Sequence, residues 1–150
     1  MDALQLSFCP PCSAGRTDAD GNCQFKALST SCFGTDNRHL RIRRVVCDYM
    51  ERNWDKYKES VTTSDYVDRM RRPGTWGDHL TLDAFCNAYG ENVIVMRPDG
   101  SPTLLQSRTG ASSNGDWKAI VYSASRHHYT CCDPWFATPT SQYIEKWKAS

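Results

Sequence analysis

The spacing of apolar residues changes once along this 150-residue chain, from a helical pattern before Gly90 to a strand pattern after it. Over 38–58, apolar side chains recur at spacings of three and four, which predicts one long helix. A second set over 82–89 has the same spacing, and Gly90 is expected to end that helix. The range 92–96 is a short, β-rich apolar run that is typical of a buried strand. Because the helices come first and the strands later, we expect an α+β fold.

The remaining elements are predicted from the same patterns and from the turn residues between them. The length suits one domain with a sizeable core, without room for two independent domains. We divide the chain into an N-terminal segment at 1–16, a folded domain at 17–136 and a C-terminal tail or short helix at 137–150. Within these parts we expect helices at 23–33 and 65–71, strands at 102–106, 117–122 and 127–132, and a short amphipathic helix or irregular tail at 143–147.

The overall composition limits the classes of partner. The net charge of +1 gives no global electrostatic reason to expect a nucleic acid or a membrane. The predicted long helix begins with a basic cluster, but this cluster lacks the interleaved aromatic residues of a stacking platform, so we interpret it as a solvated face. No apolar run approaches the roughly 20 residues of a membrane span, and no signal peptide is evident. We therefore expect a cytoplasmic monomer. The basic cluster consists of Arg38, Arg41, Arg43 and Arg44.

Eight cysteines are many for this length, and without a secretion signal they favour reduced thiols, a metal or catalysis over disulfides. Cys9 and Cys12 have a C-x-x-C spacing. A zinc site would need two further ligands, and the adjacent pair Cys131 and Cys132 matches the usual spacing poorly. We therefore expect no metal site and no cofactor. The cysteines expected to be small buried hydrophobes on helix faces are Cys32, Cys47 and Cys86.

The stretch from Asp20 to Cys23 carries the strongest chemical signal. Asp20, Gly21 and Asn22 form a turn-rich run, and we expect Gly21 to supply backbone angles closed to other residues. Cys23 then stands at the start of the predicted helix, where free N–H groups and the helix dipole lower a cysteine pKa and make the sulfur a nucleophile. N–H groups of the preceding turn are placed to hold an oxyanion. The alternative is a buried structural cysteine after an ordinary turn.

A cysteine nucleophile needs a base, most often a histidine that is distant in sequence. Four histidines are available: His39, His79, His127 and His128. Alternation along the strand predicted at 127–132 places the last two on opposite faces, so that only one of them can face the cysteine. The pattern alone leaves this choice open.

Three stretches resemble the OTU (ovarian tumour) family of cysteine proteases, which remove ubiquitin from proteins, and they occur in the family's order. The first is Asp20-Gly21-Asn22-Cys23 followed by an aromatic residue. The second is Trp76-Gly77 within 66–80, where this chain has Asp78 in place of the family's usual second glycine. The third is the His128-Tyr129 pair. The resemblance spans about residues 17–133.

This resemblance implies a papain-like α+β fold in which a small sheet packs between helices. It implies that Cys23 is the nucleophile, that His128 is the base and that Asp20 belongs to the active site, with Gly21 and Asn22 in the oxyanion loop. It assigns Trp76 to packing. The family commonly has Asp or Asn two residues after the histidine, where this chain has Thr130. Asp18 and Asp133 are the other candidates for a third member.

The resemblance also implies the activity. We expect a cysteine-dependent deubiquitinase that hydrolyses isopeptide bonds at the C-terminus of ubiquitin in conjugates or polyubiquitin chains, with ubiquitin-like modifiers as alternative substrates. A catalytically weak ubiquitin-binding module on the same fold is the second hypothesis. A nucleic-acid-binding domain is the third, and a salt-dependent gel shift would reveal it.

Overall fold

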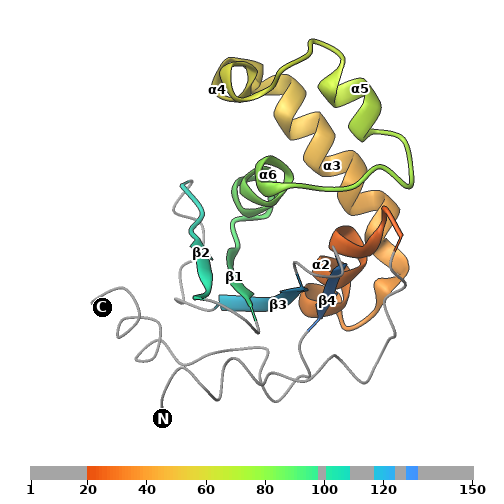
Figure 1. The fold of residues 1–150 in the computed structure, drawn as a ribbon, viewed down its shortest axis with the longest axis vertical. Helices are drawn as coiled ribbons and strands as arrows, with labels where there is room; N and C mark the ends of the chain where they lie inside the picture. Colours follow the sequence, from red (N-terminus) through yellow and green to blue (C-terminus); the bar gives the residue numbers. More distant parts are fainter. Residues whose placement is uncertain (1–19, 98–100, 109–116, 124–127, 132–150) are drawn as a thin grey trace.

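The computed structural model describes residues 20–97, 101–108, 117–123 and 128–131 (Figure 1). The predicted segments at 1–16, 137–150 and 143–147 lie outside these residues. Every helix and strand predicted inside them is present, although the long helix is divided. The helices are α2 (Cys23–Phe33), α3 (His39–Arg52), α4 (Trp54–Tyr57), α5 (Tyr66–Met70) and α6 (His79–Tyr89), with 3-10 turns η1 (Asp36–Arg38) and η2 (Lys58–Ser60), and the strands are β1 (Asn92–Met96), β2 (Thr103–Leu105), β3 (Trp117–Ser123) and β4 (His128–Cys131).

The helix predicted over 38–58 is broken at Asn53, so the prediction of one continuous helix is wrong. Asn53 has φ −116° and ψ 34°, and it separates α3 from α4. Its side-chain amide donates to the Tyr49 carbonyl at 2.9 Å. The same carbonyl also accepts the Asn53 backbone N–H at 3.0 Å, so the helical bond is kept and the break lies in the backbone angles of Asn53. The apolar side chains on either side of the break still reach one core.

The four strands form one mixed sheet in the order β2-β1-β3-β4. Strands β1 and β3 are parallel, whereas β2 and β4 are antiparallel to their neighbours. In the β3–β4 pair, Tyr122 lies opposite Tyr129 and Ser123 lies opposite His128. This order leaves β4 as an edge strand among the described residues, with its outer backbone groups available to a helix.

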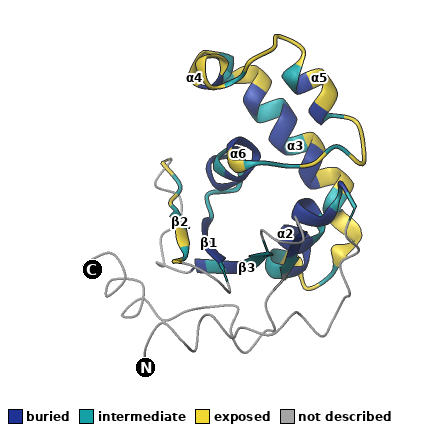
Figure 2. Ribbon diagram, viewed as in Figure 1, coloured by how far each residue is buried: buried dark blue, intermediate teal, exposed yellow. Residues whose placement is uncertain are grey.

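Helices α2 and α6 pack directly on the sheet, α2 against β3 and β4 and α6 against β1 and β2. Helix α3 contacts both α2 and α6, and Figure 1 shows α3, α4 and α5 on the side of α6 that is away from the strands. The buried faces of α2, α3 and α6 and strand β1 meet in one core (Figure 2). The arrangement confirms an α+β fold with a small sheet packed against helices.

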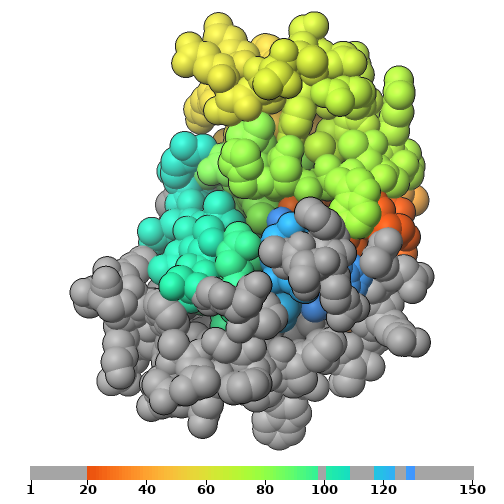
Figure 3. Space-filling view, in the orientation of Figure 1, coloured from red at the N-terminus to blue at the C-terminus, as the bar shows by residue number. Residues whose placement is uncertain are grey.

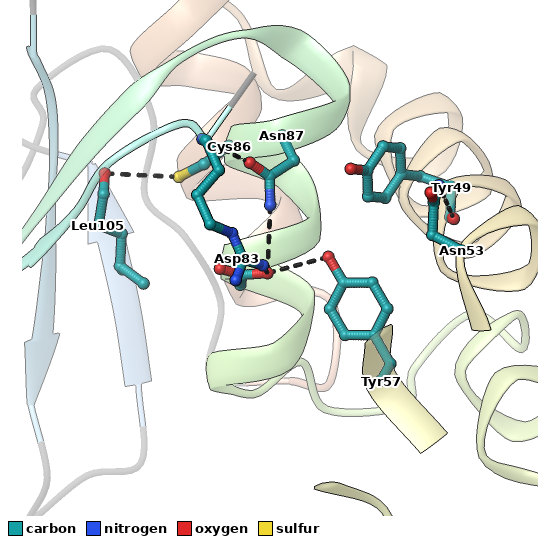
Figure 4. A network of polar contacts seen from close by, with 8 residues as sticks. Tyr49, Asn53, Tyr57, Asp83, Cys86, Asn87 and Leu105 are labelled. Atoms are coloured by element: carbon teal, nitrogen blue, oxygen red, sulfur yellow. Dashed lines mark hydrogen bonds and ion pairs between the residues drawn. The ribbon is translucent and has the colours of Figure 1, made fainter. Parts of the chain in front are cut away.

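Polar contacts around Asp83 of α6 attach the chain after β2 to the helical layer (Figure 4). The Asp83 carboxylate accepts the Tyr57 hydroxyl at 2.9 Å and pairs with Arg108 at 2.6 Å. Asn87 donates to the same carboxylate and accepts the Arg108 N–H at 2.7 Å. Close by, the Cys86 thiol donates to the Leu105 carbonyl at 3.7 Å. These contacts link β2 to α6 and α4.

Two of the three cysteines expected in helix faces, Cys47 and Cys86, are buried, as predicted, and Cys32 is half-buried. Burial raises the pKa of Cys47 to about 11 and of Cys86 to about 12. These thiols are therefore protonated at neutral pH. No helix in the described ranges is both long enough and apolar enough to span a membrane.

Candidate active site

Cys23 is the first residue of α2, as predicted, and its side chain is completely buried. Its Sγ accepts the backbone N–H of Tyr129 at 3.4 Å. Tyr129 lies on β4, so the thiol caps a backbone donor of an edge strand. The contact joins two segments that are 106 residues apart in the chain, and it brings the preceding residue of that strand, His128, close to the helix that bears Cys23.

Burial raises the pKa of the Cys23 thiol, and the charge of Asp20 raises it further. The N–H of Tyr129 and the first N–H groups of α2 lower the pKa, but their effect is smaller than that of burial. The predicted lowering of this pKa is therefore wrong for the described structure, because desolvation disfavours the thiolate. Cys23 needs a base to become a nucleophile at neutral pH.

His128 is the first residue of β4, and only 4% of it is exposed. It lies opposite Ser123, and Thr130 lies opposite Val121, so both side chains leave the same face of the sheet. Tyr129 leaves the other face. This agrees with the predicted alternation, in which His128 and Thr130 share a face. His127, Asp18 and Asp133 lie outside the described residues.

Asp20 shapes the loop before Cys23 through its hydrogen bonds. Its carboxylate accepts the Asn22 N–H at 2.9 Å, and its carbonyl accepts the Cys23 N–H at 3.2 Å. Lys26 approaches the same carboxylate at 3.8 Å. Of the three N–H groups at 21–23, that of Gly21 is the one without a hydrogen-bond partner among the described residues. Gly21 therefore offers the available donor of the predicted oxyanion loop.

Gly21 is needed for close packing and not for an unusual backbone angle. A Cβ on Gly21 would lie 1.5 Å from the carbonyl oxygen of Gly74. Within the described ranges, the glycines with positive φ are Gly34, Gly74 and Gly90, so the predicted reason for Gly21 is wrong. Gly74, with φ 90°, forms the turn against which the loop rests.

Arg43 is the site residue that sequence reasoning missed. It was assigned to a solvated face, but only 1% of it is exposed. One terminal nitrogen, Nη2, donates to the Gly21 carbonyl and to Asn22 Oδ1, at 3.1 and 3.0 Å. The other, Nη1, donates to the carbonyls of Met70 and Thr75, both at 2.9 Å. The helical spacing contained a signal, because Arg43 precedes the buried Val46, Cys47 and Met50 of the same helix face by three, four and seven residues.

Asp78, which replaces the family's usual glycine, is the N-cap of α6. Its carboxylate accepts the N–H groups of Leu80 and Thr81 and the hydroxyl of Tyr66. Its φ of −140° is extended backbone that any residue adopts. A Cβ on Gly77, directly before it, would lie 2.3 Å from Gln24 Oε1, so the Gln24 side chain would have to move to admit one. An aspartate therefore fits at 78.

A cleft of about 590 Å³ lies between the chain at 76–79 and the strands β3 and β4. Tyr129 donates its backbone N–H to Cys23 and also lines this cleft, so the cleft borders the thiol's surroundings. Trp76 is 46% exposed there, which contradicts its assignment to packing. Figure 3 shows the chain near 66–80, strand β3 and the start of the described chain on one face. The cleft is lined by Trp76, Gly77, Asp78, His79, Tyr122 and Tyr129.

The described residues contain no cluster of three potential metal-ligating side chains. Cys9, Cys12 and Cys132 lie outside these residues, so the expected absence of a zinc site stays a prediction. The chemistry that the described site supports is that of a thiol, an imidazole and a backbone N–H donor.

Residues 18–132 match the family described as OTU-like cysteine protease. The OVARIAN TUMOR DOMAIN-containing deubiquitinating enzyme 10 of Arabidopsis thaliana is 39% identical over 118 residues, which cover 73% of this chain and 33% of the plant protein. The chain thus spans about a third of that relative.

Solved OTU domains have the same fold. The OTU domain of OTUD1 has a TM-score of 0.66 at 15% identity, with 84% of each chain covered. The Hazara virus OTU bound to ubiquitin has a TM-score of 0.60 at 19% identity, with 81% of this chain and 84% of the viral chain covered. These likenesses confirm the predicted fold class.

Proposed function

Because the chain belongs to the family of OTU-like cysteine proteases, we propose that it is a cysteine-dependent deubiquitinase with Cys23 as nucleophile and His128 as base. The observation that carries this proposal is the contact of Cys23 Sγ with the Tyr129 N–H. It brings the helix start that bears the thiol to the strand that begins with the histidine. The names of the plant relatives and the ubiquitin bound to the viral domain support ubiquitin as the partner.

In the proposed reaction, His128 takes the proton of Cys23, and the thiolate attacks the carbonyl carbon of the ubiquitin C-terminal glycine. The Gly21 N–H donates to the oxyanion. When the intermediate collapses, the C–N bond breaks and His128 gives its proton to the leaving lysine amine. His128 then takes a proton from water while the water oxygen attacks the thioester carbon. The C–S bond breaks, the ubiquitin carboxylate is released, and His128 returns the proton to the Cys23 thiolate.

Asp20 supports this chemistry by holding the loop, and Thr130 is the candidate third member on the same strand face as His128. We further propose that the protein acts as a cytoplasmic monomer and needs no cofactor, nucleic acid or membrane. Ubiquitin-like modifiers are the alternative substrates.

A ubiquitin-binding module with weak activity is the second candidate. The raised pKa of Cys23 and its complete burial favour it, because both keep the thiol protonated and shielded. In that case ubiquitin would bind without being cleaved from conjugates.

Incubation with ubiquitin that bears a C-terminal electrophile, followed by intact mass measurement, tests the proposal. We expect one adduct on the wild-type protein and none on Cys23→Ala. Both proteins should show the same thermal unfolding midpoint, which controls for the fold. Wild-type protein that forms no adduct, yet binds unmodified ubiquitin, would favour the second candidate.

A further inference from the structure

We propose that Arg43 is a positioning residue that orients the backbone of the nucleophile loop, Asp20–Asn22, for transition-state binding. This inference rests on the proposed function. The hydrogen bonds of Arg43 go to Gly21, Asn22, Met70 and Thr75 and not to Cys23 or to a residue that lines the cleft, so its effect on the reaction is transmitted through the loop.

The guanidinium of Arg43 joins the nucleophile loop to the turn at 70–75. Each terminal nitrogen donates to one of the two segments. Nη2 donates to the loop, and Nη1 donates to the carbonyls at both ends of the turn. Asn22 Oδ1 closes the connection, because it also accepts the Gly74 N–H at 2.8 Å. The Asn22 side chain is therefore used for this long-range contact and not as a cap of α2.

Three bonds fix two consecutive peptide groups of the loop, and Arg43 makes one of them. The carbonyl and N–H of a trans peptide point in opposite directions. Since the Gly21 carbonyl is held by Arg43, the Asn22 N–H points the other way, toward the Asp20 carboxylate that accepts it. The Asp20 carbonyl accepts the Cys23 N–H, so the Gly21 N–H of the same peptide has a fixed direction and no acceptor within the loop. The donor for the oxyanion is thus held in place before the substrate arrives.

Lysine cannot reproduce this arrangement. A guanidinium is a planar fork that reaches four acceptors from two nitrogens, whereas an ammonium is a single point with three donors. The Arg43 cation also lies 4.3 Å from the ring centroid of Phe25, the second residue after Cys23. The hydrogen bonds of Arg43 go to backbone carbonyls and to Asn22 Oδ1 and not to the thiol, whereas the charge of Asp20 raises the pKa of Cys23. Loss of the fork should therefore change the loop geometry and leave the thiol chemistry unchanged.

The test compares Arg43→Lys with Arg41→Lys, an exposed arginine of the same helix. Two rates are measured: hydrolysis of ubiquitin carrying a fluorogenic amide, and alkylation of Cys23 by chloroacetamide. Alkylation is a displacement at saturated carbon and forms no oxyanion. For Arg43→Lys we expect kcat to fall about 100-fold, as when an oxyanion donor is lost. The KM and the alkylation rate should stay within about threefold of wild type, and the pH midpoint of alkylation should be unchanged. Arg41→Lys should match wild type in all of these measurements.

A parallel fall of alkylation and kcat would overturn the inference, because Arg43 would then support the thiol or the fold. An unchanged kcat would overturn it too. If Arg43→Lys does not fold, Asn22→Ala gives the same test, because it removes the acceptor that Arg43 shares with Gly74. If both variants fold, the double variant should cost little more than either one alone, and additive losses would contradict a shared route.

Hydrogen exchange separates this inference from the proposed function. If the wild-type protein releases no fluorophore, the proposed function fails, but the anchoring can still be measured. Amides at 20–23 should then exchange faster in Arg43→Lys, while those of α6 and β1 keep their wild-type rates. Unchanged exchange at 20–23 would overturn the anchoring itself.

Discussion

Replacing Gly21 by alanine tests how strongly the nucleophile loop depends on close packing against the turn at Gly74. An ideal Cβ on Gly21 would lie 1.5 Å from the Gly74 oxygen, whereas ordinary contact begins near 3.4 Å. The two backbones must therefore separate by about 1.9 Å, the difference between these distances. The 2.8 Å bond from the Gly74 N–H to Asn22 cannot survive that movement.

The cost follows from the contacts at risk. Overpacking typically costs about 1–3 kcal/mol, and each lost hydrogen bond about 1 kcal/mol. Two bonds are strained, those from Gly74 to Asn22 and from Arg43 to the Gly21 carbonyl. We therefore expect the free energy of unfolding to fall by about 3–5 kcal/mol. Urea unfolding monitored by tryptophan fluorescence measures it.

Gly34→Ala is the matched control. Gly34 has φ 77°, but a Cβ there would meet nothing within 4 Å. This variant should lose only the cost of a left-handed residue, roughly 1–2 kcal/mol. A Gly21→Ala protein no less stable than Gly34→Ala would refute the reasoning, because steric contact with Gly74 would then carry no penalty.

Three further predictions concern the reaction. His128→Ala should lower kcat by several orders of magnitude, as removal of a base does, while His127→Ala should have little effect; the reverse result would mean that the other histidine is the base. Thr130→Ala should reduce kcat about tenfold or less, since a hydroxyl brings no charge to the imidazolium, and a loss equal to that of Cys23→Ala would identify a full triad member. In His128→Ala, the alkylation rate of Cys23 should reach half of its maximum only above pH 9.0, the pKa of an unperturbed thiol, because burial raises the pKa of Cys23; a midpoint below 9.0 would contradict this sign.

The sequence predicted the elements with strong periodicity. The helix that ends at Gly90 and the strand at 92–96 match α6 and β1, because each carries an uninterrupted apolar pattern and a defined stop. The break at Asn53 was missed, since the apolar spacing continues across it and only the backbone angles of this one residue depart from the helix. Periodicity reports which face is buried and does not detect a change of backbone angles at a single residue.

The position of Cys23 was predictable, but the direction of its pKa shift was not. The helix start is a local property of residues 20–28, and from this local property alone one predicts a lowered pKa for the cysteine. Desolvation depends on the burial of Cys23 in the folded domain, where strand β4, distant in the sequence, lies against the thiol. The same limit explains Trp76, whose exposure depends on the cleft formed with β3 and β4.

The motif Asp20-Gly21-Asn22-Cys23 is explained better by tertiary contacts than by turn propensity. Gly21 and Asn22 have αR or ordinary angles that other residues can adopt, so the turn alone would not demand them. Gly21 is required by the approach of Gly74, and Asn22 by the donors of Gly74 and Arg43. Asp20 then accepts the N–H groups of Asn22 and Cys23. The four residues thus form one surface that fits Arg43 and the turn at 70–75. If the same four residues were placed in a protein without those partners, they should not hold the same loop geometry.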